Sequence, residues 1–131
     1  MSKRANAKSL CVIVVADNPE TIDGLHDYLS QAGVAVRSSR SLPTAHMLRP
    51  RADALVFFPD EFRVDDVIAK LTELRAAHPR LPILIVTGCG PHFTRALEPD
   101  GRSLPPIVLP KPAFGWTIMD AVRAQTSSEE P

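Results

Sequence analysis

Five short apolar runs, separated by segments with helical spacing, most constrain the fold of this chain. They are continuous and rich in β-branched residues, as is typical of strands covered on both faces. Strands that alternate with helices pair in parallel through right-handed crossovers, which predicts an α/β fold with helices on both faces of one sheet. Five such strands fit the doubly wound order 2-1-3-4-5. The runs are Leu10–Val15, Val34–Val36, Ala54–Phe58, Ile83–Val86 and Ile107–Leu109.

The segments between the runs predict helices. After the first run, Asn18 can cap a helix, Pro19 suits its first position and Gly33 its end. Two weaker helices are expected at Pro43–Arg49 and around His92–Leu97. Apolar faces are formed by Ile22, Leu25, Leu29 and Ala32 in the first helix, by Val64, Val67, Ile68, Leu71 and Leu74 in a helix ending at His78-Pro79, and by Ile118, Met119 and Val122 in the last.

Length and charge narrow the class of protein. With 131 residues the chain fits one domain, expected at 9–124, with an N-terminal tail at 1–8 and a disordered tail at 125–131. Fifteen Lys and Arg balance fifteen Asp and Glu, which excludes a strongly basic nucleic-acid binder. The longest apolar run, Leu10–Ala16, has seven residues against the roughly 20 that a membrane span needs, so a cytoplasmic domain is expected.

Neither the cysteines nor the histidines form a metal-ligand pattern. Cys11 and Cys89 would lie roughly 16 Å apart, beyond the roughly 7 Å that a disulfide allows between Cα atoms. Cys89 is a candidate redox sensor, but a lone cysteine is more often structural. No cofactor is expected, and no nucleophile–base pair can be assembled from the strand ends, so an enzyme is not expected.

Three motifs at the predicted strand ends resemble the receiver domain of bacterial response regulators. They are Val14-Val15-Ala16-Asp17-Asn18-Pro19, Ile85-Val86-Thr87-Gly88 and Leu109-Pro110-Lys111-Pro112. The resemblance covers residues 9–124 and implies the flavodoxin-like receiver fold, commonly with a cis bond at Lys111-Pro112. It also implies that acids after the first and third strands hold Mg²⁺. An aspartate ending the third strand would accept a phosphoryl group from a histidine kinase, with Thr87 and Lys111 binding its oxygens.

The sequence departs from this family pattern at the acceptor. Phe58 aligns with the acceptor aspartate, and a shift of one residue places Pro59 there. Asp60 is the nearest carboxylate, but Pro59 is expected to end a central strand before it. Counting from Asp17 instead places the acceptor near Asp60 or Glu61, so Asp60 stays open as an alternative phosphoacceptor, with a weak Mg²⁺ site formed by Asp17 and Asp60.

Other departures point the same way. Ala16 replaces the first acid of the family's pair, and Val108 replaces the aromatic residue of its switch. Asp17 is then expected mainly at the start of the first helix, paired with Lys111, and Thr87 is expected to bond nearby backbone. Asp17, Phe58, Pro59, Thr87 and Lys111 would form a vestigial phosphorylation site.

A partner surface is expected over the fourth helix, the fifth strand and the last helix, which the family generally uses for contacts. Its predicted residues are Phe93, Val108, Phe114 and Trp116. Of the two aromatic residues that begin the last helix, one is expected to pack on the sheet. Residues 98–106 are expected to form an irregular loop.

Together these features favour a stand-alone, atypical receiver domain that signals by protein–protein contact without phosphorylation. Its partner would be another signalling protein, either a histidine kinase or a downstream effector, and a homodimer is an option. Two alternatives stay open: a phosphoacceptor response regulator with a shifted acceptor at Asp60, and a small-molecule module that binds a nucleotide or flavin at the switch point of the sheet.

Overall fold

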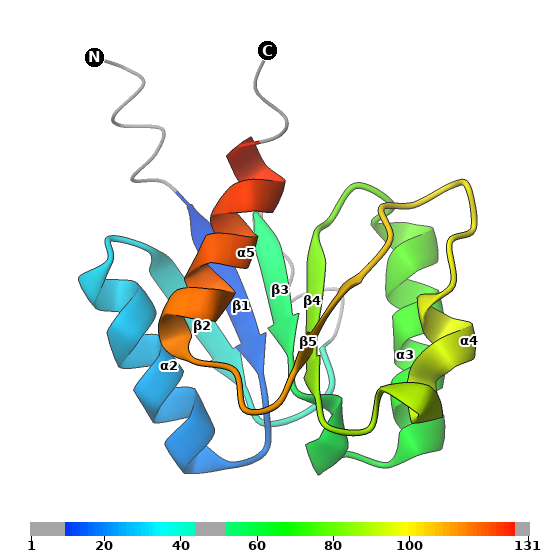
Figure 1. Cartoon of the computed structure of the whole chain (residues 1–131), viewed down its shortest axis with the longest axis horizontal. Coiled ribbons are helices and arrows are strands. Elements are labelled where there is room, and N and C mark those ends of the chain that lie inside the picture. Colours follow the sequence, from blue (N-terminus) through cyan, green and yellow to red (C-terminus); the bar gives the residue numbers. More distant parts are fainter. Residues whose placement is uncertain (1–9, 44–51, 128–131) are drawn as a thin grey trace.

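A five-stranded parallel sheet with strand order β2-β1-β3-β4-β5 forms the centre of the molecule, as predicted (Figure 1). The computed structural model describes residues 10–43 and 52–127, so the helix expected at Pro43–Arg49 lies almost entirely outside the described residues. The strands are β1 (Cys11–Val15), β2 (Ala35–Ser39), β3 (Ala54–Phe57), β4 (Ile83–Thr87) and β5 (Ile107–Pro110).

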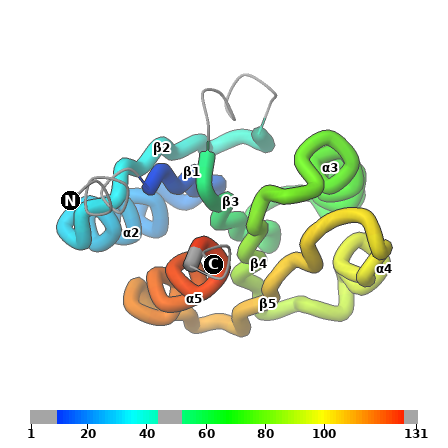
Figure 2. The backbone as a smooth tube through the Cα atoms, turned by 90° about the horizontal axis from the view of Figure 1, so that it is seen from above, coloured from blue at the N-terminus to red at the C-terminus, as the bar shows by residue number. Residues whose placement is uncertain are grey.

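Two helical layers cover the sheet, one on each face (Figure 2). Helices α2 (Pro19–Gln31) and α5 (Gly115–Ser127) lie on one face, and α3 (Val64–Ala77) and α4 (Thr94–Leu97) lie on the other. Successive residues of a strand point to opposite faces. Val12, Val14 and Val56 therefore pack under α2 and α5, while Ile13, Val15 and Leu55 pack under α3 and α4.

The three central strands β1, β3 and β4 are buried almost throughout, which explains their continuous apolar runs. The edge strands β2 and β5 are partly exposed, and Pro110 ends β5 without an amide hydrogen. Among the helices that the structure describes, none is long and apolar enough to cross a lipid bilayer.

Local signals set the ends of α2, whereas α5 runs further than expected. Asn18 Oδ1 accepts hydrogen bonds from the amides of Glu20 and Thr21, as expected of a cap, and Gly33 has a φ of 91°. Ala32, predicted on the apolar face of α2, is exposed, because the helix has ended at Gln31. Helix α5 continues through Ser127, past the predicted domain end at residue 124, and Thr126 Oγ1 donates to the carbonyl of Val122.

Short 3₁₀ turns complete the connections at the carboxyl ends of β3 and β4. The turn η2 (Pro59–Glu61) follows β3, and η3 (Gly90–Phe93) precedes α4. As predicted, β3 ends before Pro59, since a proline lacks the amide hydrogen that a central strand needs. Residues 98–106 form the expected irregular loop.

Candidate functional site

The carboxyl ends of β3, β4 and β5 bring Asp60, Thr87 and Lys111 together. Parallel strands end at one edge of a sheet, so residues distant in sequence meet there. Thr87 is the last residue of β4 and lies opposite Pro110 of β5, and the amide of Lys111 donates to the carbonyl of Thr87 over 3.3 Å. The bond between Lys111 and Pro112 is cis, as the resemblance implied.

Phe58 lies in the core and not in this cluster of polar groups. Its amide donates to the carbonyl of Val15 over 2.9 Å, which continues the pairing of β3 with β1. Its side chain is 6% exposed and belongs to the apolar cluster beneath α2 and α5. Pro59 is also buried and begins the turn η2. The position aligned with the family's acceptor therefore holds a core aromatic residue followed by a turn.

The turn η2 directs the carboxylate of Asp60 into the polar cluster. Thr87 Oγ1 donates to Asp60 Oδ1 over 2.5 Å. The Gly88 amide donates to Oδ2 over 2.8 Å, and Lys111 Nζ lies 3.4 Å from the same oxygen. The Asp60 side chain is 19% exposed, so both of its oxygens are bound by protein groups in a partly buried site.

These contacts favour the ionised form of Asp60. Partial burial raises the pKa of this carboxyl, but hydrogen bonds from Thr87 and Gly88 and the charge of Lys111 outweigh that effect. The pKa of Asp60 consequently lies below its ordinary value.

Thr87 is fixed by two hydrogen bonds. Its side chain is buried, and Oγ1 accepts from the amide of Cys89 over 2.8 Å while donating to Asp60. The predicted bond to nearby backbone is confirmed. The link to Asp60 is additional, and it holds the turn after β3 against the end of β4.

Asp17 pairs with Arg40 and not with Lys111, so the predicted pair of Asp17 with Lys111 is wrong. Arg40 Nη2 lies 3.5 Å from Asp17 Oδ1, and Arg40 Nε donates to the Asp17 carbonyl over 2.9 Å. Lys111 instead pairs with Asp60, because η2 carries that carboxylate toward β5. Arg40 was missed, since it follows β2 without any recognisable motif.

Glu61 was noted in the sequence only as a possible acceptor position, and its observed role is different. Its Oε1 accepts from the amides of Asp17 and Asn18 over 2.5 and 2.7 Å. These amides precede α2, where a carboxylate is favoured by the helix dipole. Glu61 thus joins the loop after β3 to the loop after β1.

The acids at this edge do not fit the magnesium site that the resemblance implies. Asp17, Asp60 and Glu61 each contact a different set of donors, and Ala16 lacks a carboxylate. Among residues 10–43 and 52–127, no group of three or more His, Cys, Asp or Glu side chains could hold a metal ion. Mg²⁺ needs several converging oxygens, which this arrangement does not present.

The predicted partner surface requires correction. Phe93 is 1% exposed and packs in the core under α3 and α4. Phe114 and Trp116 are 52% and 56% exposed and stack with their ring centroids 4.6 Å apart, so neither packs on the sheet. Ala113 and Ile118 contact the core at this end of the chain instead. Val108 is exposed on β5, as expected.

The two cysteines are free. Cys89 is exposed after β4 and Cys11 is partly buried at the start of β1.

Comparison with known proteins finds similar structures but no matching family model or curated sequence. A response regulator receiver protein from Sinorhizobium medicae superposes with a TM-score of 0.77 and 20% identity, over 95% of this chain and 99% of that one.

Two further structures agree. The signal receiver domain of an HD domain-containing protein from Pseudomonas fluorescens gives a TM-score of 0.74 at 16% identity, over 92% of this chain and 96% of that one. A Francisella response regulator receiver domain gives 0.72 at 16% identity, over 93% of this chain and 100% of that one. This chain therefore has the flavodoxin-like fold of response regulator receiver domains.

Proposed function

We propose that this chain is an atypical receiver domain that acts in signal transduction by protein–protein contact and without phosphorylation. The observation that carries the proposal is the state of Asp60. Its two oxygens are bound by Thr87, Gly88 and Lys111, and two of these, Thr87 and Lys111, stand at positions that the resemblance gives to phosphoryl binding. The internal carboxylate thus takes the place of an incoming anion.

The surroundings of Asp60 support the same function. A carboxylate that attacks phosphorus needs an available oxygen and a metal ion that neutralises the phosphoryl group. Both oxygens of Asp60 are engaged, and Asp17 is held by Arg40. Phe58, at the aligned acceptor position, cannot carry a phosphoryl group.

The test is incubation with acetyl phosphate and Mg²⁺, followed by intact-mass measurement. No mass increase is expected in the wild-type chain or in Asp60→Asn. A phosphoryl adduct that appears in the wild type and disappears in Asp60→Asn would overturn the proposal.

A phosphoryl adduct that depends on Asp60 would establish the alternative function, a response regulator with its acceptor at Asp60. This alternative requires Thr87 and Lys111 to move from the carboxylate of Asp60 to a bound phosphoryl group. The separation of Asp17 from Asp60 weighs against it.

The partner would be another signalling protein, either a histidine kinase or a downstream effector. The exposed pair Phe114 and Trp116 is the strongest candidate for an anchor, because aromatic side chains dominate many protein interfaces. A homodimer through the same residues would show as concentration-dependent mass in sedimentation, removed by Phe114→Ser together with Trp116→Ser.

A further inference from the structure

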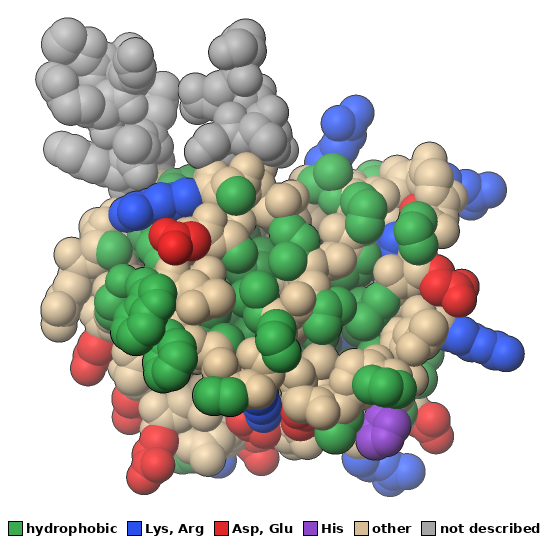
Figure 3. Space-filling view, in the orientation of Figure 1, with side chains coloured by type: hydrophobic (Ala, Val, Ile, Leu, Met, Phe, Trp, Pro, Cys, Tyr) green, Lys and Arg blue, Asp and Glu red, His purple; other side chains and the backbone are tan. Residues whose placement is uncertain are grey.

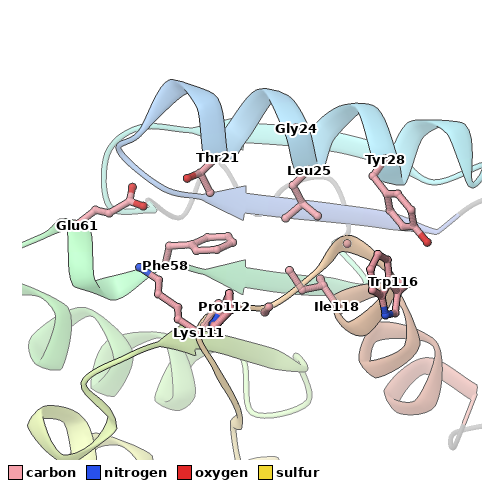
Figure 4. Close-up of a pocket in the computed structure, with 13 residues that line it drawn as sticks. Thr21, Gly24, Leu25, Tyr28, Phe58, Glu61, Lys111, Pro112, Trp116 and Ile118 are labelled. Carbon is pink, nitrogen blue, oxygen red and sulfur yellow. The ribbon is translucent and has the colours of Figure 1, made fainter.

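A cleft of about 750 Å³ lies between α2 and the segment that joins β5 to α5 (Figure 4). Its volume is within the range of small-molecule sites, and its lining follows their usual composition of apolar walls with a few polar groups. Leu25, Phe58 and Ile118 form apolar walls between the two ends. Thr21, Glu61 and Lys111 lie at one end, and Tyr28 and Trp116 at the other.

The two aromatic residues leave their end of the cleft open to solvent. Tyr28 is packed so closely over Gly115 that a Cβ at this glycine would lie 2.8 Å from the ring. Trp116 is stacked on Phe114 and is more than half exposed. Hydrophobic side chains gather on this face of the molecule (Figure 3). Because Tyr28 and Trp116 are both exposed side chains of the lining, an apolar group could reach this end of the cleft without unfolding the core.

Charge at the polar end selects the ligand. Lys111 is neutralised by Asp60, whereas among the described residues the Glu61 carboxylate accepts hydrogen bonds from backbone amides alone, and both of those bonds go to Oε1. The second oxygen of Glu61 is left for a ligand. Helix α2 adds Glu20, Asp23 and Asp27, all exposed, and its sequence contains no Lys or Arg. Glu20 and Asp27 lie one turn on either side of Gly24, which lines the cleft.

We infer that this cleft binds a small organic cation, an amine attached to an aromatic or branched apolar body. The ammonium group would pair with Glu61 and the apolar body would lie along Leu25 and Phe58 toward Trp116. A carboxylate in the same position would face the charge of Glu61, while the charge of Lys111, which also lines the cleft, is offset by its pair with Asp60, so anions are disfavoured. This site goes beyond the proposed contact between proteins, although it shares Trp116 with that contact, and its preference for cations requires Lys111 to stay paired with Asp60.

Three probes of one shape and different charge test the inference: phenylbutylamine, phenylbutanol and phenylbutyrate. Trp116 is the only tryptophan of the chain, so its fluorescence reports on the cleft, with calorimetry as a second measurement. We expect the amine to bind about tenfold more tightly than the carboxylate, with the alcohol between them. Absence of amine binding, or equal binding of amine and carboxylate, would overturn the inference.

Two variants locate the site. Glu61→Gln keeps an oxygen for the amides of Asp17 and Asn18 but removes the charge, so the amine should lose its advantage over the alcohol. Gly24→Leu places a side chain in the cleft, and a Cβ at this glycine meets nothing within 4 Å, so the fold should persist while binding of all three probes is lost. Ser30→Leu, at an exposed position of α2 outside the lining, is the matched control and should bind as the wild type does. Unchanged binding in Gly24→Leu or unchanged preference in Glu61→Gln would contradict the assignment.

Discussion

The hydroxyl of Thr87 donates to the carboxylate of Asp60 across 2.5 Å, which fastens the turn after β3 to the end of β4. Removing the hydroxyl while keeping the shape of the side chain isolates this link. We expect Thr87→Val to reduce the free energy of unfolding by about 1–2 kcal/mol, because Asp60 and the Cys89 amide both lose a partner. Urea denaturation measures the change. Thr72→Val, on the exposed face of α3, is the control and should stay within about 0.5 kcal/mol of the wild type.

The pH dependence of stability should report on Asp60. Its pKa is lower in the folded chain than the ordinary 3.8, so its ionised form stabilises the fold. This contribution is fully present above the unfolded pKa and is lost as the pH falls through the folded pKa. Asp60→Asn should therefore be less stable than the wild type at pH 7, by about 1 kcal/mol, and the difference should shrink below about pH 4.

Thermal unfolding of the two proteins between about pH 7 and pH 2.5 measures this effect. A difference that stays constant over the whole range would show that Asp60 does not favour its ionised form in the folded chain. Asp100, whose pKa is lowered to about 2 by hydrogen bonds from Ser103 and Arg102, should behave in the same direction, with its contribution lost as the pH falls toward 2.

Substitution by alanine should have opposite effects on the free energy of unfolding at two helical glycines, Gly24 and Gly115. A Cβ at Gly24 meets nothing within 4 Å, so Gly24→Ala should raise the free energy of unfolding by about 0.5–1 kcal/mol. A Cβ at Gly115 would lie 2.8 Å from the ring of Tyr28 and displace it, so Gly115→Ala should lower stability by about 1 kcal/mol. Adding Tyr28→Ala should remove most of that penalty. A stabilising Gly115→Ala would mean that the ring moves at no cost.

Arg75 is buried and holds the loop that precedes β5. Its guanidinium donates to the carbonyls of Ala96 and Glu98 over 2.8 Å each and lies 3.6 Å from Asp100. Arg75→Met should lower the free energy of unfolding by about 2–3 kcal/mol, because the buried carbonyl of Ala96 and the partly buried carbonyl of Glu98 lose their donor. Hydrogen exchange should increase most in residues 98–106. Arg80→Met, on the exposed turn after α3, should change neither measurement.

The sequence predicted the sheet well because its signals there are local and redundant. Apolar runs, Asn18 and Pro19 at the start of α2, and Pro59 after β3 each act on their own neighbourhood, and the structure confirms them. The expected loop at residues 98–106 is likewise confirmed.

The pairing of charges at the strand ends was not predictable in the same way. Which acid meets Lys111 depends on how a single turn, η2, directs Asp60 relative to Asp17, and a 3₁₀ turn of three residues leaves no periodic signal. Phe93 was misplaced for a similar reason. The helix that follows it is too short for an apolar face to be recognised in the sequence. The short turn η3 directs the side chain of Phe93 into the core.

The edge strand β5 ends at Pro110 and is preceded by Pro105 and Pro106. Prolines give an edge strand fewer amide hydrogens for a neighbouring chain to pair with, which protects against aggregation through sheet extension. Only Ile107, Val108 and Leu109 have amide hydrogens in β5, and parallel pairing with β4 uses part of that set. Two copies of this domain would therefore not join their sheets through β5, and an association at this edge would use side chains such as the stacked aromatic pair.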